Sequence, residues 1–217
     1  MDNYGKVVLF DLDGTLVDTA PEMHLAMNAL LKEEGLKSLP YESIRPHVSN
    51  GVMGIFKNVF EDNPQFGGRR FNRYLDIYEE YLGINAITFP GIDEVISKIQ
   101  EKRIDWGIVT NKSKRFAKPL LSKLKLLNQT SCLVCGDTTG SLKPDPEPIN
   151  HALSLLQTKN IKGSFYIGDS KKDVDAAKAA GISSIACTYG YITDDTEPEN
   201  WNADYYVDHA LEIVNVI

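Results

Sequence analysis

The chain has 217 residues, of which 42% are hydrophobic and 24% are charged, and its formal net charge is −7. This length allows one full domain with a sizeable insertion, and the composition is that of a soluble globular protein. The acidic charge argues against nucleic acid as the main partner, because binding to a phosphate backbone needs an excess of Lys and Arg. The longest apolar run near the N-terminus, residues 7–10, is too short for a signal peptide or a membrane span, so a cytoplasmic protein is expected.

Short apolar runs predict five strands, and segments with helical periodicity separate most of them. The strands are expected at residues 6–10, 105–110, 131–135, 164–168 and 184–189. Apolar residues recur on one helical face in the segments 92–99, 117–124 and 149–156. Strands that alternate with helices indicate βαβ units, and therefore an α/β fold built on a Rossmann-like parallel sheet.

The alternation is interrupted between about residues 20 and 89, where the sequence has helical patterns and no convincing strand. The interruption indicates a small helical domain inserted after the first strand. The expected division is an α/β core of residues 1–16 and 90–217 and a helical domain of residues 17–89. Short linkers near residues 16–20 and 87–91 are the expected hinge.

Three cysteines, Cys132, Cys135 and Cys187, cannot all pair with one another. The C-x-x-C of Cys132 and Cys135 lies in a predicted strand, where residues three apart point to opposite faces, and no second pair completes a zinc site. Buried structural thiols are therefore expected.

Polar residues follow four of the predicted strands, and in open α/β sheets the ligand site lies beyond the carboxyl ends of the strands. In chain order these residues are Asp11, Asp13, Thr110, Asn111, Lys112, Lys143, Asp169, Ser170 and Asp173. Because the strand ends share one edge of the sheet, we expect the side chains to meet there.

A cluster of Asp11, Asp13 and Asp169 is unfavourable without a cation, since neighbouring carboxylates disfavour the ionisation of one another. A hard divalent ion makes the cluster favourable. Mg²⁺ prefers oxygen ligands and binds through a few carboxylates together with substrate phosphate. The sequence therefore predicts a Mg²⁺ site that involves these three residues.

The remaining residues suit a transferring phosphoryl group. The hydroxyl of Thr110, the amide of Asn111 and the ammonium of Lys143 can hold its oxygens. Asp11 can then attack phosphorus to form an aspartyl-phosphate. Asp13, two residues on, can protonate the departing alkoxide and afterwards activate water. The pattern predicts a phosphomonoesterase.

Each motif alone has a structural explanation, as a turn, a helix cap or a stiff linker. Together, "FDLDGTLVDT", "VTNK", "KPDPEP" and "IGDSKKD" resemble the four motifs of the haloacid dehalogenase superfamily of phosphohydrolases. The resemblance covers essentially the whole chain, and the helical insertion corresponds to the cap domain of that family. It implies Mg²⁺ as cofactor, Asp11 as nucleophile, Asp13 as acid/base, and Asp169 as a metal ligand, with the main-chain carbonyl of Asp13 as another.

The same resemblance implies that Thr110 and Lys143 bind phosphate and that Asp173 supports the site from outside the metal shell and orients the lysine. Longer stretches, such as "WGIVTNKSKRFAKPL" and "TYGYITDDTEPENWNADYYVDH", resemble the phosphoglycolate phosphatases. Within them they are most similar to the branch that removes phosphate from N-acetylmuramic acid 6-phosphate in cell-wall recycling. The implied partner is a small anionic phosphorylated metabolite, and a monomer or homodimer is expected.

Two alternatives stay open. A sugar phosphomutase of the β-phosphoglucomutase type shares all four motifs, and a non-catalytic binding module could keep the fold. A dehalogenase is disfavoured, because dehalogenases lack the acid that this chain has at Asp13.

The substrate is expected to meet the cap in the stretch "SIRPHVSNGVMG". Arg45 and His47 are the candidate substrate-binding residues, since both favoured substrates carry a carboxylate that Arg can bind in bidentate fashion. Further candidates are Ser49 and Asn50 in the cap, and Arg115 on the core side of the rim beside Phe116, which is expected to be a core residue.

Overall fold

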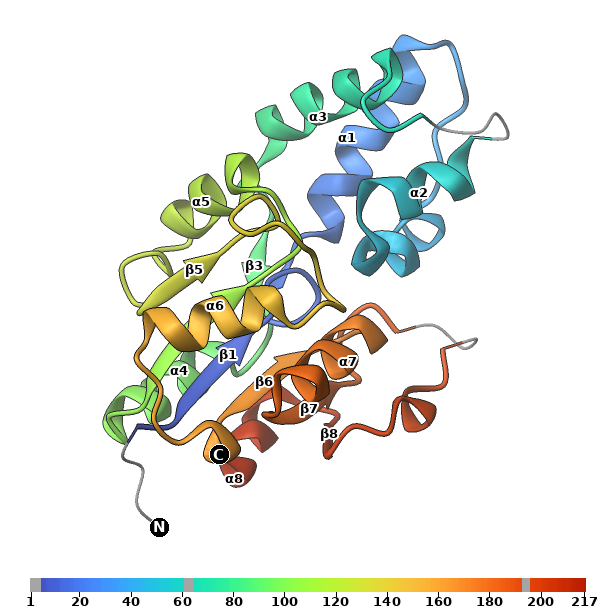
Figure 1. Ribbon diagram of the computed structural model, residues 1–217. Coiled ribbons are helices and arrows are strands. Elements are labelled where there is room, and N and C mark those ends of the chain that lie inside the picture. Colours follow the sequence, from blue (N-terminus) through green and yellow to red (C-terminus); the bar gives the residue numbers. More distant parts are fainter. Residues whose placement is uncertain (1–4, 61–64, 193–195) are drawn as a thin grey trace.

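The computed structural model describes residues 5–60, 65–192 and 196–217. Its core is a six-stranded sheet with the order β5-β4-β1-β6-β7-β8, and all the pairings are parallel (Figure 1). The strands are β1 Val7–Phe10, β4 Asp105–Val109, β5 Cys132–Val134, β6 Phe165–Gly168, β7 Ser183–Cys187 and β8 Tyr205–Val207. Strand β1 lies between β4 and β6. The sheet continues with β4 and β5 on one side of β1 and with β6, β7 and β8 on the other. The topological switch point, where ligands bind in such sheets, is thus at the carboxyl end of β1.

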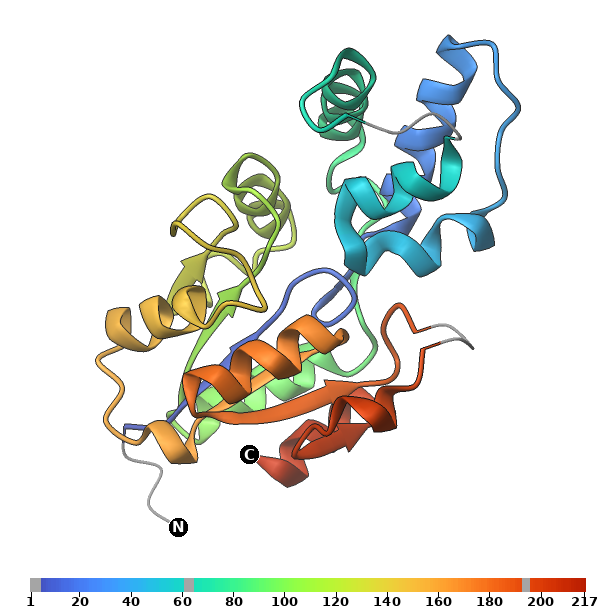
Figure 2. The same cartoon turned by 45° about the vertical axis from the view of Figure 1, so that its right-hand side comes forward.

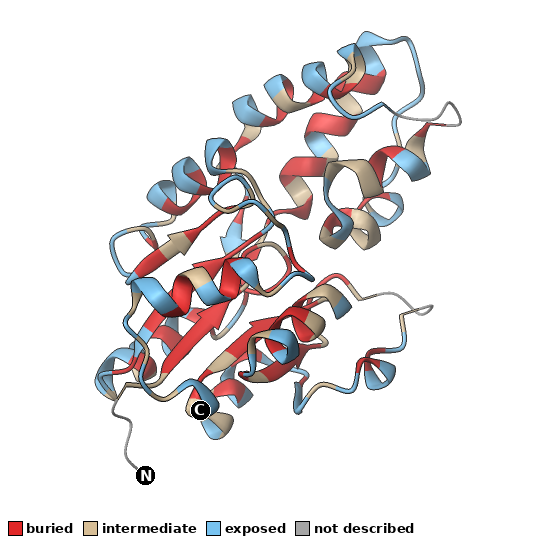
Figure 3. Ribbon diagram, viewed as in Figure 1, coloured by how far each residue is buried: buried red, intermediate tan, exposed pale blue. Residues whose placement is uncertain are grey.

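Helices cover both faces of this sheet. The helices of the core are α4 Ile92–Glu101, α5 Lys114–Lys123, α6 Glu147–Leu155, α7 Lys171–Ala180 and α8 Ile213–Val216, with short 3₁₀ segments at Ile161–Gly163, Pro198–Trp201 and Ala210–Glu212. Alternate residues of β1 belong to different apolar clusters: Val7 and Leu9 pack with α6 and α7, whereas Val8 and Phe10 pack with α4. In Figure 3 the central strands of the six-stranded sheet are mostly buried, and exposed residues lie on the outer sides of the helices. The expected α/β fold is confirmed.

The helical insertion stands over the carboxyl ends of the strands (Figure 2). It contains α1 Ala20–Glu33, α2 Gly51–Val59 and α3 Arg69–Tyr81, with 3₁₀ segments at Tyr41–Ser43 and Arg45–Asn50. Helix α1 packs along α3, and the ring of Phe56 on α2 contacts those of Phe71 and Tyr74 on α3. We call this insertion the cap.

Two short strands join the cap to the core, β2 Val17–Asp18 and β3 Ile87–Thr88, which pair in antiparallel fashion. The expectation that residues 20–89 hold no strand was therefore wrong at β3. Two residues are too few to show the alternation by which a strand is recognised in sequence. β8 was also not predicted, and its pairing with β7 shows that it continues the sheet.

All three cysteines are free and buried, and Cys132 and Cys135 belong to apolar clusters on opposite faces of the sheet. This confirms the expected structural thiols. Among the described residues, no helix combines the length and the apolar character that crossing a membrane requires.

Candidate active site

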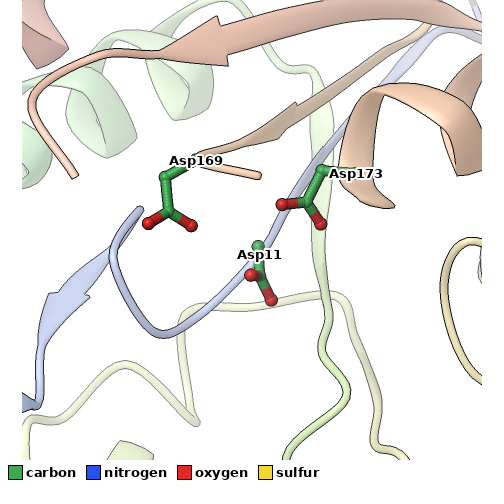
Figure 4. A group of neighbouring side chains, drawn as sticks. All are labelled: Asp11, Asp169 and Asp173. Carbon is green, nitrogen blue, oxygen red and sulfur yellow. The ribbon is translucent and has the colours of Figure 1, made fainter. Parts of the chain in front are cut away.

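Three carboxyl groups gather at the switch point of the sheet (Figure 4). Asp11 directly follows β1, Asp169 directly follows β6, and Asp173 lies in the first turn of α7. Each offers an oxygen, and the three oxygens lie within 4.8 Å of one another. Burial, together with the charges of its two neighbours, raises the pKa of Asp169 to about 8. Burial also raises the pKa of Asp11 to about 6, although the charge of Lys143 opposes the shift.

Asp169 is buried and only half satisfied. Its Oδ2 accepts hydrogen bonds from Ser49 Oγ at 2.7 Å and from the main-chain N–H of Tyr191 at 3.0 Å. Its Oδ1 is buried and finds no partner in the described parts of the chain. A carboxylate oxygen in that state, facing other carboxylates and no nitrogen or sulfur ligand, fits a hard cation such as Mg²⁺.

The main chain passes unusually close to Asp169. Gly14 has a φ of +84°, and a Cβ at this position would lie 2.0 Å from Oδ2 of Asp169. Gly190 approaches from the other side, where a Cβ would lie 2.4 Å from the Cβ of Asp169. The glycine of "DLDG" is thus needed both for its positive φ and for the space that Asp169 occupies.

Lys143 provides the positive charge beside the cluster. Its ammonium group is buried and lies 2.8 Å from Asp11 Oδ1, 2.7 Å from Asp173 Oδ1 and 2.6 Å from the hydroxyl of Tyr166. The Tyr166 hydroxyl in turn donates to the carbonyl of Val109 at 2.6 Å. Burial alone would lower the pKa of Lys143, but the two carboxylates outweigh it and the pKa is raised. The lysine is therefore charged and fixed in direction.

Both carboxylate oxygens of Asp173 accept hydrogen bonds. Oδ1 accepts from Lys143, while Oδ2 accepts from the main-chain N–H of Ser170 at 3.0 Å and from its hydroxyl at 2.6 Å. These contacts close the first turn of α7 in the manner of a helix cap. Asp173 thus holds Lys143 and the loop after β6, and Asp11 and Asp169 are the carboxylates left to face a cation.

Asp13 does not belong to this group of three carboxyl groups. Its Oδ1 accepts a hydrogen bond from the hydroxyl of Thr19 at 2.5 Å and lies 2.8 Å from the ammonium of Lys112. Burial would lower the pKa of Lys112, but the charge of Asp13 outweighs it and the pKa is raised. From the sequence, Lys112 is one of the residues after β4 with no predicted role, because a lysine in "VTNK" shows no sign that it is buried.

Thr110 and Asn111 follow β4 beside Asp11. The buried Thr110 hydroxyl accepts from the main-chain N–H of Lys112 at 3.1 Å, and no acceptor for its own proton is found in residues 5–60, 65–192 and 196–217. The side-chain amide of Asn111 instead binds the main chain of Lys143 twice, at 2.9 and 3.0 Å. Asn111 thereby positions the lysine loop.

A cavity of about 620 Å³ lies between these residues and the cap. Asp11, Asp13, Thr110 and Lys143 line it on the core side. The cap contributes mostly apolar side chains, among them Val48, Val52, Met53, Phe71, Leu75 and Tyr78. A ligand that enters thus meets polar groups at the sheet and an apolar wall opposite.

Arg45 and His47 do not line this cavity. Arg45 instead crosses to the core, where its guanidinium donates to the carbonyl of Gly190 at 2.7 Å and lies 5.3 Å from the centre of the Tyr191 ring. The Tyr191 hydroxyl accepts from the main-chain N–H of Thr19 at 2.7 Å, at the beginning of α1. Arg45 and Tyr191 thus fasten the cap to the core.

Other predicted rim residues also bridge the two parts. Ser49 bonds to Asp169, and the side-chain carbonyl of Asn50 accepts from Lys172 at 3.2 Å. Arg115 pairs with Asp76 and Glu79 of α3 at 2.8 and 2.5 Å, on the exposed side of the cap. Phe116 is buried, as expected for a core residue, and also lines the cavity.

Comparison with known proteins agrees with this geometry. The family described as haloacid dehalogenase-like hydrolase matches residues 8–187. The chain is 36% identical over 214 residues to an N-acetylmuramic acid 6-phosphate phosphatase of Pseudomonas putida, which covers 98% of this chain and 96% of the relative. It is 34% identical over 211 residues to a phosphoglycolate phosphatase of Xanthomonas campestris. This match covers 97% of this chain and 95% of the relative.

Among solved structures, one described as a predicted phosphoglycolate phosphatase from Haemophilus somnus superposes with a TM-score of 0.85, covering 100% of this chain and 99% of that one at 23% identity. At that identity the likeness concerns the fold. The family match and the more similar relatives also support membership of a protein family. The chain therefore belongs to the haloacid dehalogenase-like hydrolases, within the part of that family whose named members are phosphatases.

Proposed function

We propose that the protein is a Mg²⁺-dependent phosphomonoesterase that forms an aspartyl-phosphate on Asp11 and acts on N-acetylmuramic acid 6-phosphate. The observation that supports it most is the arrangement at β1, where Asp11 lies beside a fixed lysine and beside an unsatisfied oxygen of Asp169. This arrangement opens into a cavity with an apolar wall.

Asp11 attacks phosphorus in the first step, and the bond from phosphorus to the ester oxygen breaks. A pKa of about 6 leaves the Asp11 carboxyl mostly ionised at neutral pH, so it can act as nucleophile. Lys143 and the Thr110 hydroxyl bind phosphoryl oxygens in a buried site, where charge is poorly screened. The loops after β4 and β5 thus orient the phosphoryl group over Asp11.

Asp13 moves the protons. It protonates the departing alkoxide, and it then takes a proton from the water that attacks the aspartyl-phosphate and releases inorganic phosphate. The residues that would hold Mg²⁺ are Asp11, Asp169 and the main-chain carbonyl of Asp13. When bound, the ion supplies positive charge that offsets the carboxylates and the phosphoryl oxygens.

The cavity favours a substrate larger than phosphoglycolate. Its volume of about 620 Å³ lies within the range of small-ligand pockets, and much of its cap side is apolar. Phosphoglycolate has two carbons, each next to a charged group, and would leave this wall unused. N-acetylmuramic acid 6-phosphate adds a sugar ring, an acetyl group and a lactyl methyl group, which can contact it.

A comparison of the two esters tests the proposal. We expect kcat/KM for N-acetylmuramic acid 6-phosphate to exceed that for phosphoglycolate by at least about tenfold, or about 1.4 kcal/mol of transition-state binding. Measuring free phosphate also separates hydrolysis from phosphoryl transfer between sugar positions. Equal values, or a preference for phosphoglycolate, would contradict the assigned substrate but not the phosphatase activity.

Met53 tests the apolar wall directly. Met53→Gln keeps the length of the side chain but makes it polar, so kcat/KM for the sugar ester should fall by about fivefold, or about 1 kcal/mol. The value for phosphoglycolate should change by less than about twofold. Lys57→Gln, on an exposed position of α2, is the matched control. An equal loss on both esters would show that Met53 does not select the substrate.

The pKa of Asp169 predicts how Mg²⁺ stabilises the protein. Its carboxyl titrates near pH 8 when folded, against a usual value of 3.8, so the ion-free folded state keeps a proton that the unfolded chain releases. Stability without Mg²⁺ should therefore fall as pH rises from about 4 to about 8. Mg²⁺ must displace that proton, so its stabilising effect should grow over the same range.

Thermal melts with and without MgCl₂ across this pH range measure the effect. Asp169→Asn should remove both the Mg²⁺-induced rise in Tm and its pH dependence, because the residue that titrates and binds is lost. Asp175→Asn, on an exposed face of α7, should keep both. A rise in Tm that is independent of pH would contradict the role of Asp169.

A further inference from the structure

Lys112 is a buried cation next to the acid/base residue, and the mechanism above does not use it. Its side chain is 8% exposed, and its ammonium lies 2.8 Å from Oδ1 of Asp13. The ring of Tyr78, from cap helix α3, lies over this ammonium with its centre 5.0 Å away. The lysine is thus enclosed between a residue of the core and a residue of the cap.

We propose that Lys112 is a positioning residue that aims the carboxyl group of Asp13 at the leaving group, and that Tyr78 holds it there only when the cap is seated on the core. The proposal rests on the proposed function, since it concerns the proton that Asp13 transfers in that reaction.

The hydrogen bonds of Asp13 separate its two oxygens. Oδ1 accepts one hydrogen bond from the hydroxyl of Thr19 and one from the ammonium of Lys112. Oδ2 has no protein partner in the described ranges 5–60, 65–192 and 196–217, and Asp13 lines the cavity. Because two donors occupy Oδ1, the proton for the leaving group is carried by Oδ2, on the side of the substrate.

In the proposed reaction, Oδ2 of Asp13 gives up one proton in the first step and regains one in the second. The Oδ2–H bond of Asp13 breaks as the alkoxide leaves phosphorus, and the alkoxide departs as an alcohol. The carboxylate that remains is stabilised by the nearby Lys112 ammonium. Water then gives its proton back to Oδ2 as its oxygen attacks phosphorus, and the bond from phosphorus to Asp11 breaks.

Tyr78 makes this arrangement depend on the cap. Tyr78 is buried, and its ring packs against that of Phe116 on α5. The ring therefore lies at the boundary between cap and core. The ammonium of Lys112 lies over the Tyr78 ring, 5.0 Å from its centre, so the aromatic side chain covers the cation on the side of the cap. If the cap lifts, Lys112 loses this cover and Asp13 loses a fixed partner.

Leaving groups that differ in their need for a proton test the proposal. The value of kcat/KM includes only the steps up to departure of the leaving group, where Asp13 acts as acid. An alkyl ester needs the proton, whereas the p-nitrophenolate of p-nitrophenyl phosphate leaves without it. We expect Lys112→Met to lower kcat/KM by at least about tenfold on N-acetylmuramic acid 6-phosphate and on glucose 6-phosphate, and by less than about threefold on the aryl ester.

Two further variants keep the test independent of folding defects. Lys112→Arg retains a cation and should recover part of the loss on alkyl esters. Tyr78→Leu leaves both charges in place, and because Tyr78 also lines the cavity we expect some loss on every ester and a larger loss on alkyl esters than on the aryl ester. Lys114→Met, two positions away and exposed, is the matched control for removing a lysine charge.

Other outcomes would overturn the proposal. An equal loss on alkyl and aryl esters would mean that Lys112 maintains the site in general. A loss on N-acetylmuramic acid 6-phosphate without one on glucose 6-phosphate would mean that it binds the substrate carboxylate. If the unmodified enzyme releases no phosphate from any ester, the proposed function itself fails, which is a different result from activity without selectivity in the variants.

Discussion

Asp11→Asn is expected to abolish Mg²⁺-dependent phosphate release, with a fall in kcat of about 10⁴-fold or more. The amide is nearly the same size as the carboxyl but cannot form the aspartyl-phosphate. The fold should survive, because Asn still offers Lys143 an oxygen and no longer carries a charge that burial penalises.

Phosphate release at saturating substrate and a thermal melt provide the two measurements. Asp76→Asn, which changes an exposed carboxyl that pairs with Arg115, should leave phosphate release near the unmodified level. If Asp11→Asn retains more than about a hundredth of the original kcat, Asp11 is not the nucleophile.

Lys143→Ala should lower both catalysis and stability. The ammonium is the donor that Asp11, Asp173 and the Tyr166 hydroxyl share, so its removal leaves the buried Asp173 and the mostly buried Asp11 without a counter-charge. Removing one partner of a buried ion pair typically costs about 3–5 kcal/mol of unfolding free energy. Loss of its contact to the phosphoryl group should lower kcat by about 10²- to 10³-fold.

Chemical denaturation and steady-state kinetics separate the two effects. The stability loss should shrink as pH falls, because the unpaired Asp11 carboxyl, whose pKa burial raises, can then take up a proton. Lys171→Ala, which removes an exposed partner of Asp175, should change the unfolding free energy by less than about 1 kcal/mol. A kcat loss of less than about tenfold for Lys143→Ala would count against its role in binding phosphate.

The part of the site that could be predicted from sequence is the part that follows strands. Asp11, Thr110 and Asp169 come directly after β1, β4 and β6, and parallel strands bring their carboxyl ends to one edge whatever their order. The apolar runs marked those strands, so the location of these residues followed from the chain alone. The strand order, which puts β1 at the centre, did not.

In the cap, the direction in which a side chain points could not be predicted from the sequence. Arg45 was expected at the substrate because of its chemistry, but in the 3₁₀ segment it turns towards Gly190 and Tyr191 of the core. Ser49, four residues on, is the side chain that reaches Asp169. Which of these two faces the site depends on how the cap sits on the core, and no local pattern contains that information.

The antiparallel pairing of β2 and β3 means that the cap begins and ends on neighbouring strands, because Val17 lies opposite Thr88. For the core, the cap is therefore equivalent to a long surface loop whose ends are already held together, and the entropy of closing such a loop depends only weakly on its length. An insertion of different length could replace it without separating the strands that carry Asp11 and Asp169, as long as it kept the contacts of Ser49 with Asp169 and of Tyr78 with Lys112. Most of the insertion can thus vary during evolution and change the substrate range, while the few cap residues that touch the strand ends stay tied to the phosphoryl chemistry.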